Sequence, residues 1–98
     1  MIVELTKAAQ SDVERAALEY EHAREGLGMR FEAELDRTLE RVEQNALQFP
    51  LVWQDVRRAL LRVFPFSVFF LIANDRVRVF AVLHQHRHPN TWKRRPRA

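Results

Sequence analysis

The stretch SVFFLIANDRVRVFAVLH, residues 67–84, decides the fold. Its first part, 67–73, is almost entirely β-branched or aromatic, which is typical of a strand covered on both faces. Asn74 and Asp75 follow as a two-residue turn, because both residue types tolerate a positive φ. The next part, 76–84, alternates in polarity with the period of a strand, and the stretch therefore predicts an antiparallel hairpin. The dry face of its second strand is expected to carry Val77, Val79, Ala81 and Leu83.

A further strand is predicted immediately before this hairpin. RRALLRV at 57–63 has alternating character, and FPF at 64–66 makes the connection to the hairpin. The predicted sheet is thus an antiparallel meander of three or four strands over about residues 51–86. In this strand one face is expected to carry Ala59, Leu61 and Val63, and the other Arg58, Leu60 and Arg62.

Two amphipathic helices are predicted in the first half of the chain, over about residues 7–49. Apolar residues recur there at spacings of three and four. Thr6 suits the N-cap of the first helix, and EGLG at 25–28 breaks the pattern between the two. A short apolar strand, IVEL at 2–5, precedes them. The two apolar stripes consist of Ala9, Val13, Ala16, Ala17 and Tyr20, and of Phe31, Leu35, Leu39, Val42 and Ala46.

These elements predict a single α+β domain over residues 1–98, with a short N-terminal strand, an antiparallel helical hairpin, a three- to four-stranded antiparallel sheet and a basic tail at 89–98. We expect the helices to cover one face of the sheet, because neither helix is stable alone. The other face is expected to present aromatic residues together with Arg58 and Arg62.

The composition excludes several classes of protein. A hydrophobic content of 47% excludes a disordered chain, and the lack of cysteine excludes disulfides and thiolate metal sites. No apolar run reaches the roughly 18 residues that a membrane-spanning helix needs, and the N-terminus has no signal-peptide pattern. We therefore expect a cytoplasmic protein that requires no cofactor and has no membrane partner.

Charge is distributed unequally along the chain. Residues 1–49 carry a balance of −5 and residues 50–98 a balance of +8, which together give the net charge of +3. The basic half invites an acidic or anionic partner. Both helices are acidic overall, so the chain lacks the basic recognition helix of a sequence-specific DNA-binding protein.

The chain ends in VLHQHRHPNTWKRRPRA, residues 82–98. Trp92 either protrudes as an anchor for a partner or folds back over an apolar patch of the sheet, and the sequence leaves both open. His84, His86 and His88 alternate and could chelate a metal ion. With no carboxylate or cysteine nearby, and with Arg87 repelling a cation, we expect no physiological metal site.

Several segments in this order resemble the ParE branch of the RelE/ParE family of type II toxin–antitoxin toxins. They are EGLGMRFEAEL in the helical hairpin, NALQFP at its end, RRALLRVFPFSVFF in the sheet, and VFAVLHQHRHPNTWKRR at the C-terminus. The resemblance implies a small cytoplasmic toxin, neutralised by a ParD-like or similar antitoxin whose C-terminal segment wraps around it. Any contact with DNA would then be made indirectly, through the antitoxin complex.

The resemblance implies two possible targets. ParE-like toxins with known targets poison DNA gyrase, whereas RelE-like toxins cut messenger RNA in the ribosome. The RNase pattern is incomplete here, because Ser67 stands where that pattern has an arginine and Trp92 stands where it usually has a tyrosine. No lysine occurs between residues 8 and 92. Gyrase poisoning is therefore the preferred interpretation, and a messenger RNase or a degenerate toxin that retains only antitoxin binding are the alternatives.

The candidate site residues follow from these two interpretations. If the chain were an RNase, His84 would be the candidate for proton transfer, and Arg87 and Arg62 would bind phosphate. If it acts by binding, we expect a surface for the target or the antitoxin. That surface would include Arg58, Arg62, His84, Arg87, Trp92 and Arg95.

Overall fold

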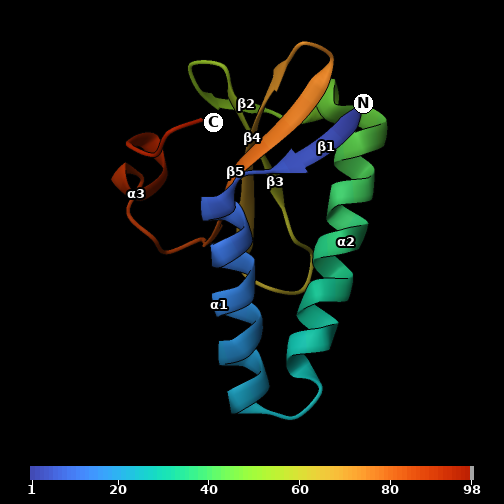
Figure 1. The fold of residues 1–98 in the computed structure, drawn as a ribbon, viewed down its shortest axis with the longest axis vertical. Helices are drawn as coiled ribbons and strands as arrows, with labels where there is room; N and C mark the ends of the chain where they lie inside the picture. The colour runs from blue at the N-terminus through green and yellow to red at the C-terminus, as the bar shows by residue number, and fades with distance from the viewer. Residues whose placement is uncertain (98) are drawn as a thin grey trace.

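A computed structural model describes residues 1–97 and shows an α+β domain with two long helices against one sheet (Figure 1). No helix among these residues has the length and hydrophobicity that crossing a membrane requires. The elements in chain order are β1 (Ile2–Leu5), α1 (Lys7–Ala23), α2 (Leu27–Asn45), the short 3-10 helix η1 (Ala46–Gln48), β2 (Leu51–Trp53), β3 (Val56–Leu60), β4 (Phe66–Ala73), β5 (Arg76–His84) and α3 (Asn90–Lys93).

The two long helices form the predicted antiparallel hairpin. The Thr6 hydroxyl accepts a hydrogen bond from the Ala9 N–H at 3.2 Å, so the predicted N-cap of α1 is confirmed. The chain reverses at Gly26, whose φ of +86° suits glycine. Gly28 allows close approach of the two helices, because a Cβ there would lie 2.5 Å from the Ala17 carbonyl oxygen. All ten residues of the two predicted apolar stripes pack into the core.

The sheet contains five strands in the order β1-β5-β4-β3-β2. The four strands β2 to β5 pair antiparallel, as predicted. The N-terminal strand β1 joins the same sheet and pairs parallel with β5, which makes the sheet mixed. The parallel partner of β1 follows it by more than 70 residues, so the helical hairpin serves as part of the crossover that a parallel pair requires.

The central hairpin forms as the sequence predicts. Asn74 and Asp75 have φ values of +53° and +61°, and two successive positive φ angles define the turn whose twist matches that of the flanking strands. All of Phe66 to Leu71 is buried, so β4 is covered on both faces.

The alternation predicted for β5 fails beyond Val79. The β4–β5 register shifts between Phe69 and Phe70, which pair with Ala81 and Val79 and leave Phe80 as an extra residue. This β-bulge reverses the phase of the strand. Val77, Val79 and Val82 therefore face the helices, whereas Phe80, Ala81 and Leu83 face the opposite side.

The strand predicted over 57–63 is also shorter than expected. β3 ends at Leu60, and Val63 is 72% exposed in the loop that follows. The buried carboxylate of Glu34 on α2 accepts hydrogen bonds from the Val63 and Phe64 N–H groups, at 2.8 and 3.2 Å. These bonds replace the ladder partners that a longer strand would need, and they hold the loop in place.

A second hydrophobic cluster covers the face of the sheet that we expected to be open. It comprises Val56, Phe69, Leu71, Phe80, Ala81, Leu83 and Trp92, with Val52 and Trp53 packed against it. The chain segment after β5, including α3, crosses to this face (Figure 1). The sheet is therefore buried on both sides, by the helical hairpin on one and by the C-terminal segment on the other.

Candidate functional site

Four of the six predicted site residues, Arg58, His84, Arg87 and Trp92, line one cavity. Arg58 projects from β3, His84 ends β5, and Arg87 lies in the loop that follows. The cavity has a volume of about 350 Å³ and opens on the face of the sheet away from the helices. Its remaining lining consists of Leu60, Ser67, Phe69, Gln85, His86 and Pro89.

This cavity is positively charged and has an apolar rim. No carboxylate lines it. Within residues 1–97 the guanidinium groups of Arg58 and Arg87 make neither an ion pair nor a side-chain hydrogen bond, so both are available to a partner. Leu60, 46% exposed, adds an apolar contact. An acidic or phosphorylated group beside an apolar side chain would match this combination.

The histidines shape the loop that carries Arg87. The Nδ1 atom of His84 accepts a hydrogen bond from the His86 N–H, and the Nδ1 atom of His88 accepts one from the Asn90 N–H, both at 3.1 Å. The rings of His84 and His86 meet edge to face, with their centroids 4.9 Å apart. In the described part of the chain no group of three or more His, Cys, Asp or Glu side chains is placed to hold a metal ion.

The expectation that Trp92 protrudes as an anchor is wrong. Its side chain is 7% exposed and stacks on Phe69, with the ring centroids 4.3 Å apart. Trp53 meets it edge-on at 6.0 Å. The alternative, that Trp92 folds back over an apolar patch of the sheet, is confirmed. The physical reason is that the outer face of β4 and β5 is aromatic, and burying the indole there removes a large apolar area from water.

Arg95 is likewise held within the chain. Its two terminal nitrogens bind the carboxylate of Asp12 on α1, at 2.5 and 3.2 Å, and one of them also donates to the Phe80 carbonyl oxygen at 3.1 Å. The Asp12 carboxylate accepts a third bond from the Val82 N–H at 2.9 Å. β1 ends at Leu5, opposite Val79, so the Phe80 carbonyl and the Val82 N–H have no partner in β1. The ion pair of Asp12 and Arg95 provides a hydrogen-bond partner for each of them.

Arg62 does not join the other arginines. It lies in the loop after β3 and lines a separate cavity of about 250 Å³, together with residues of α2 that include Glu34 and Glu40. The prediction that Arg58 and Arg62 share one face of a strand is wrong, because β3 ends at Leu60, before Arg62. Arg58 of the sheet and Arg62 of the loop therefore lie on different surfaces.

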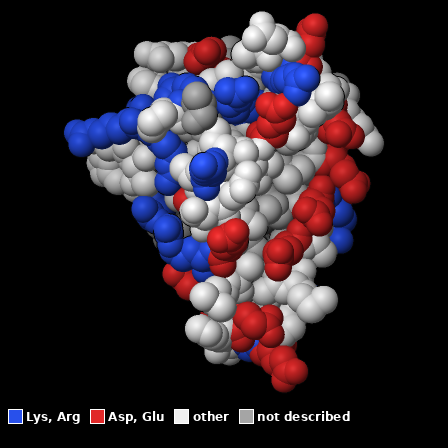
Figure 2. Space-filling model, viewed as in Figure 1, with Lys and Arg blue, Asp and Glu red and all other residues white. Residues whose placement is uncertain are grey.

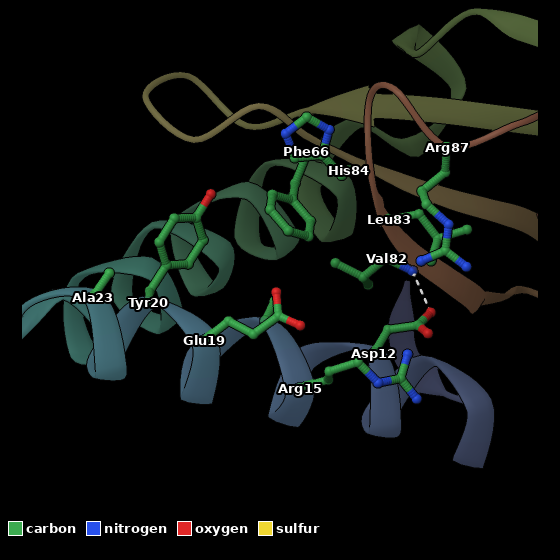
Figure 3. A pocket seen from close by; sticks show the side chains of 11 residues that line it. Asp12, Arg15, Glu19, Tyr20, Ala23, Phe66, Val82, Leu83, His84 and Arg87 are labelled. Atoms are coloured by element: carbon green, nitrogen blue, oxygen red, sulfur yellow. Dashed lines mark hydrogen bonds between the residues drawn. The ribbon is translucent and has the colours of Figure 1, made fainter.

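A larger cavity of about 510 Å³ lies between α1 and the end of β5 (Figure 3). Arg15 and Glu19 line it from the helix, and His84 and Arg87 close it from the sheet side. Burial raises the pKa of the Tyr20 hydroxyl, and the neighbouring Glu19 carboxylate raises the pKa further. His84 and Arg87 also line the cavity that contains Arg58, so they lie between these two cavities.

The sequence interpretation missed Asp12 and Glu34, which organise this region. Each is buried and bonds main-chain groups of the sheet or of its loops. The available signal was a carboxylate on an otherwise apolar helix stripe: Asp12 stands between Ala9 and Ala16 at spacings of three and four. A charge in such a position is retained only with partners.

A family model described as "ParE toxin of type II toxin-antitoxin system, parDE" matches residues 3–89. The structure of a chain from the chromosomal ParDE toxin–antitoxin system of P. aeruginosa superimposes with a TM-score of 0.77 at 18% sequence identity, covering 86% of this chain and 95% of that one. At this identity the likeness shows the fold. No curated protein matches the sequence.

The family match extends from β1 to the loop after β5 and ends at Pro89, so it includes Arg58, His84 and Arg87. It stops before Trp92, which covers the outer face of the sheet, and before Arg95, which binds Asp12. The chain belongs to the ParE toxin family of type II toxin–antitoxin systems.

Proposed function

We propose that this chain is a toxin that a cognate, ParD-like antitoxin neutralises, and that it acts in the cytoplasm by binding and poisoning DNA gyrase. Family membership supports the toxin–antitoxin pairing. The observation that favours binding is that, within residues 1–97, the guanidinium groups of Arg58 and Arg87 have no side-chain partner and lie beside the exposed Leu60. Cations with an adjacent apolar contact suit a protein–protein interface, in which arginine is a frequent anchor.

The chemistry of the cavity supports binding over catalysis. Cleavage of RNA needs a proton acceptor, a proton donor and cations around the phosphorane. Ser67 occupies the position of an arginine in the RelE-like pattern. Trp92, in place of the usual tyrosine, is stacked on Phe69 and has an indole that is a donor only. A toxin that works by occupying a target needs none of these groups.

The test of the gyrase proposal is a supercoiling and DNA-cleavage assay with purified gyrase. We expect the toxin to inhibit supercoiling or to trap cleaved DNA, and we expect Arg58→Ala and Arg87→Ala each to raise the inhibitory concentration by about tenfold. Arg30→Ala, at an exposed position of α2, is the matched control and should leave inhibition unchanged. Unimpaired gyrase at a large excess of folded toxin would refute the proposal.

A messenger RNase is the second candidate, because His84 and His86 share the cavity with both arginines. This candidate predicts codon-dependent cuts in a translation extract that His84→Ala abolishes while the fold is retained. Cuts of this kind, with gyrase unaffected, would reverse the preference.

The antitoxin part of the proposal is tested in cells. Induced expression of the chain alone should arrest growth, and co-expression of the antitoxin from the neighbouring gene should restore it. Normal growth at high levels of folded protein would indicate a degenerate toxin.

A further inference from the structure

A second cavity lies on the face of the sheet away from the helices, near the β4–β5 turn. It has a volume of about 480 Å³. The C-terminal segment contributes Trp92 to the Arg58 cavity and Arg97 to this one, so the segment lies between the two. The proposed gyrase contact does not include the second cavity. Its lining consists of Glu4, Leu71, Ala73, Asn74, Arg76, Arg78 and Arg97.

The strand pairing places two arginines of this cavity on the outer face. Arg78 is the register partner of Leu71, whose side chain belongs to the outer hydrophobic cluster, and Arg76 is the partner of Ala73. Side chains of directly paired residues share a face, so both guanidinium groups project outward. Because two residues of a strand span about 7 Å, the two charges repeat along β5 at about the separation of successive phosphates in a nucleic-acid strand.

The C-terminal segment adds two further cations. The Arg97 guanidinium lies 4.8 Å from the ring centroid of Phe80 and 5.2 Å from that of Trp53, and the Lys93 ammonium lies 5.3 Å from that of Trp53. Arg97 also donates to the main-chain oxygens of Lys93 and Arg95, at 3.4 and 3.2 Å, which holds it beside the cavity. The outer basic surface is the set of Arg76, Arg78, Lys93 and Arg97.

One carboxylate opposes these four cations. Glu4 of β1 pairs with Arg76 and with Arg78, and the three side chains are between 38 and 51% exposed. Exposed pairs of this kind are weak and can exchange partners. Asp55 and Asp75, in turns of the sheet, neither line the cavity nor take part in an ion pair within residues 1–97. Four cations and one carboxylate leave three positive charges uncompensated.

The aromatic rings of this face are covered. Phe80 is 0% and Trp92 is 7% exposed, and two cations lie over Trp53. Single-stranded nucleic acid stacks its bases on open rings, which this surface does not offer. It also differs from the Arg58 cavity, where Leu60 is an exposed apolar contact, because Leu71 here is 8% exposed. Charge without an open apolar contact suits a polyanion whose affinity comes from the release of counterions.

We propose that the outer basic surface binds the phosphate backbone of double-stranded DNA without reading its sequence. Arg76 and Arg78 bind neighbouring phosphates, and Lys93 and Arg97 extend the contact. Within residues 1–97 the helix on this face is α3, whose four residues are too few to read bases in a groove, so the contacts are to phosphate. The proposal departs from the expectation that the chain meets DNA only through the antitoxin complex. It agrees with the lack of a basic recognition helix, because phosphate contacts need none.

The test is a fluorescence anisotropy titration of short labelled DNA duplexes with the full-length toxin alone. Two duplexes of unrelated sequence should bind with affinities that agree within about twofold, since phosphates carry no sequence information. The logarithm of the association constant should fall with the logarithm of the salt concentration with a slope of about −3, as expected for three or four phosphate contacts. A single strand of the same length should bind at least about fivefold more weakly.

Removing one cation should weaken binding in a defined way. We expect Arg78→Ala to lower the affinity by about fivefold and to reduce the salt slope by about one. Arg30→Ala, an equal charge change at an exposed position of α2, is the matched control and should leave the affinity within about twofold of wild type.

Glu4→Gln should have the opposite effect. It removes the carboxylate that holds Arg76 and Arg78 and that repels phosphate, so we expect it to raise the affinity by about threefold. A loss of folding cannot imitate this gain. Glu25→Gln, an equal charge change at an exposed position in the turn between the helices, should have little effect.

The inference and the gyrase proposal fail separately. Arg58→Ala should weaken gyrase inhibition and leave duplex binding within about twofold of wild type, because Arg58 lies in the other cavity. Gyrase inhibition by a toxin that does not bind the duplex would refute the DNA contact alone. Duplex binding by a toxin that leaves gyrase unimpaired would refute the gyrase proposal alone.

Four outcomes would overturn the DNA proposal. Equal duplex binding by wild type and Arg78→Ala would remove the role of the outer basic surface. A salt slope near zero would exclude phosphate contacts. Tighter binding of the single strand would indicate that bases are bound, and tighter binding of a duplex RNA of the same length would make RNA the ligand.

Discussion

At the scale of single residues, two buried carboxylates do most to join the layers of the molecule. Asp12 ties α1 to β5 and to the C-terminal segment, and Glu34 ties α2 to the loop after β3. Both accept hydrogen bonds from main-chain N–H groups that have no strand partner. Each carboxylate thereby replaces ladder bonds that the sheet lacks at that point.

Replacing Asp12 should weaken the fold substantially. Asp12→Ala leaves the Val82 N–H and the Arg95 guanidinium without their acceptor, and we expect it to lower the free energy of unfolding by about 3 kcal/mol. Denaturant unfolding measures the change. Glu14→Ala, at an exposed position two residues along α1, should change the free energy by less than about 0.5 kcal/mol. Equal effects of the two variants would show that the buried ion pair is unimportant.

Tyr20 should make stability depend on pH in the alkaline range. Its pKa is raised in the fold, so the folded state holds the phenolic proton more tightly than the unfolded state. The stabilisation is complete below the ordinary value of 10.0 and is lost as pH rises through the higher folded pKa. Tyr20→Phe should therefore lose less stability above pH 10 than wild type does.

A direct titration checks the same point. Tyr20 is the only tyrosine, so the ultraviolet absorbance of phenolate reports this residue alone. A folded-state midpoint at or below the ordinary pKa would contradict the partial burial of this side chain as the cause of the shift.

At the scale of elements, the C-terminal segment is a third layer. Trp92 fills the aromatic surface of β4 and β5. Two cations lie over aromatic rings near Trp92. The Arg97 guanidinium is 4.8 Å from the ring centroid of Phe80, and the Lys93 ammonium is 5.3 Å from the ring centroid of Trp53. Such contacts stabilise docking of a short basic segment that could not fold by itself.

Removing the indole of Trp92 from this layer should destabilise the domain. We expect Trp92→Ala to lower the free energy of unfolding by about 3–5 kcal/mol, because it empties a buried aromatic site. Asn90→Ala, at an exposed position of α3, should cost much less. If Trp92→Ala left stability unchanged while weakening the action on the target, the indole would be a contact residue and its packing on Phe69 would be incidental.

At the scale of the whole molecule, acidic and basic residues are separated on the surface as they are along the chain. Acidic side chains gather over α2, whereas basic ones gather on the side of the molecule where the C-terminal segment lies (Figure 2). The Arg58 cavity lies on the basic side, whereas the groove between β1 and α2 that Asp36, Glu40 and Glu43 line lies on the acidic side.

This segregation predicts how the association rate depends on salt. If Arg58 and Arg87 guide the chain to an acidic or phosphate-bearing surface of gyrase, the association rate should fall steeply as ionic strength rises, and less steeply for Arg58→Ala. Surface plasmon resonance at several salt concentrations measures this. A rate independent of salt would show that the basic surface does not steer the encounter.

The sequence by itself determined the elements and their order. Spacings of three and four residues placed the helical stripes, Thr6 and Gly26 marked their ends, and Asn74 with Asp75 marked the hairpin turn. These features depend on local backbone preferences and on periodic burial, which a sequence records directly. The family resemblance rested on the same order, and Arg58, His84 and Arg87 could be selected from it as candidates.

Only the tertiary structure decided what covers the second face of the sheet. The Phe80 bulge, the parallel pairing of β1 with β5, the burial of Trp92 and the capture of Arg95 by Asp12 all join segments far apart in the chain, or shift a register by one residue. Such choices depend on which distant groups satisfy each other's apolar surface and hydrogen bonds, and local patterns contain no record of that competition.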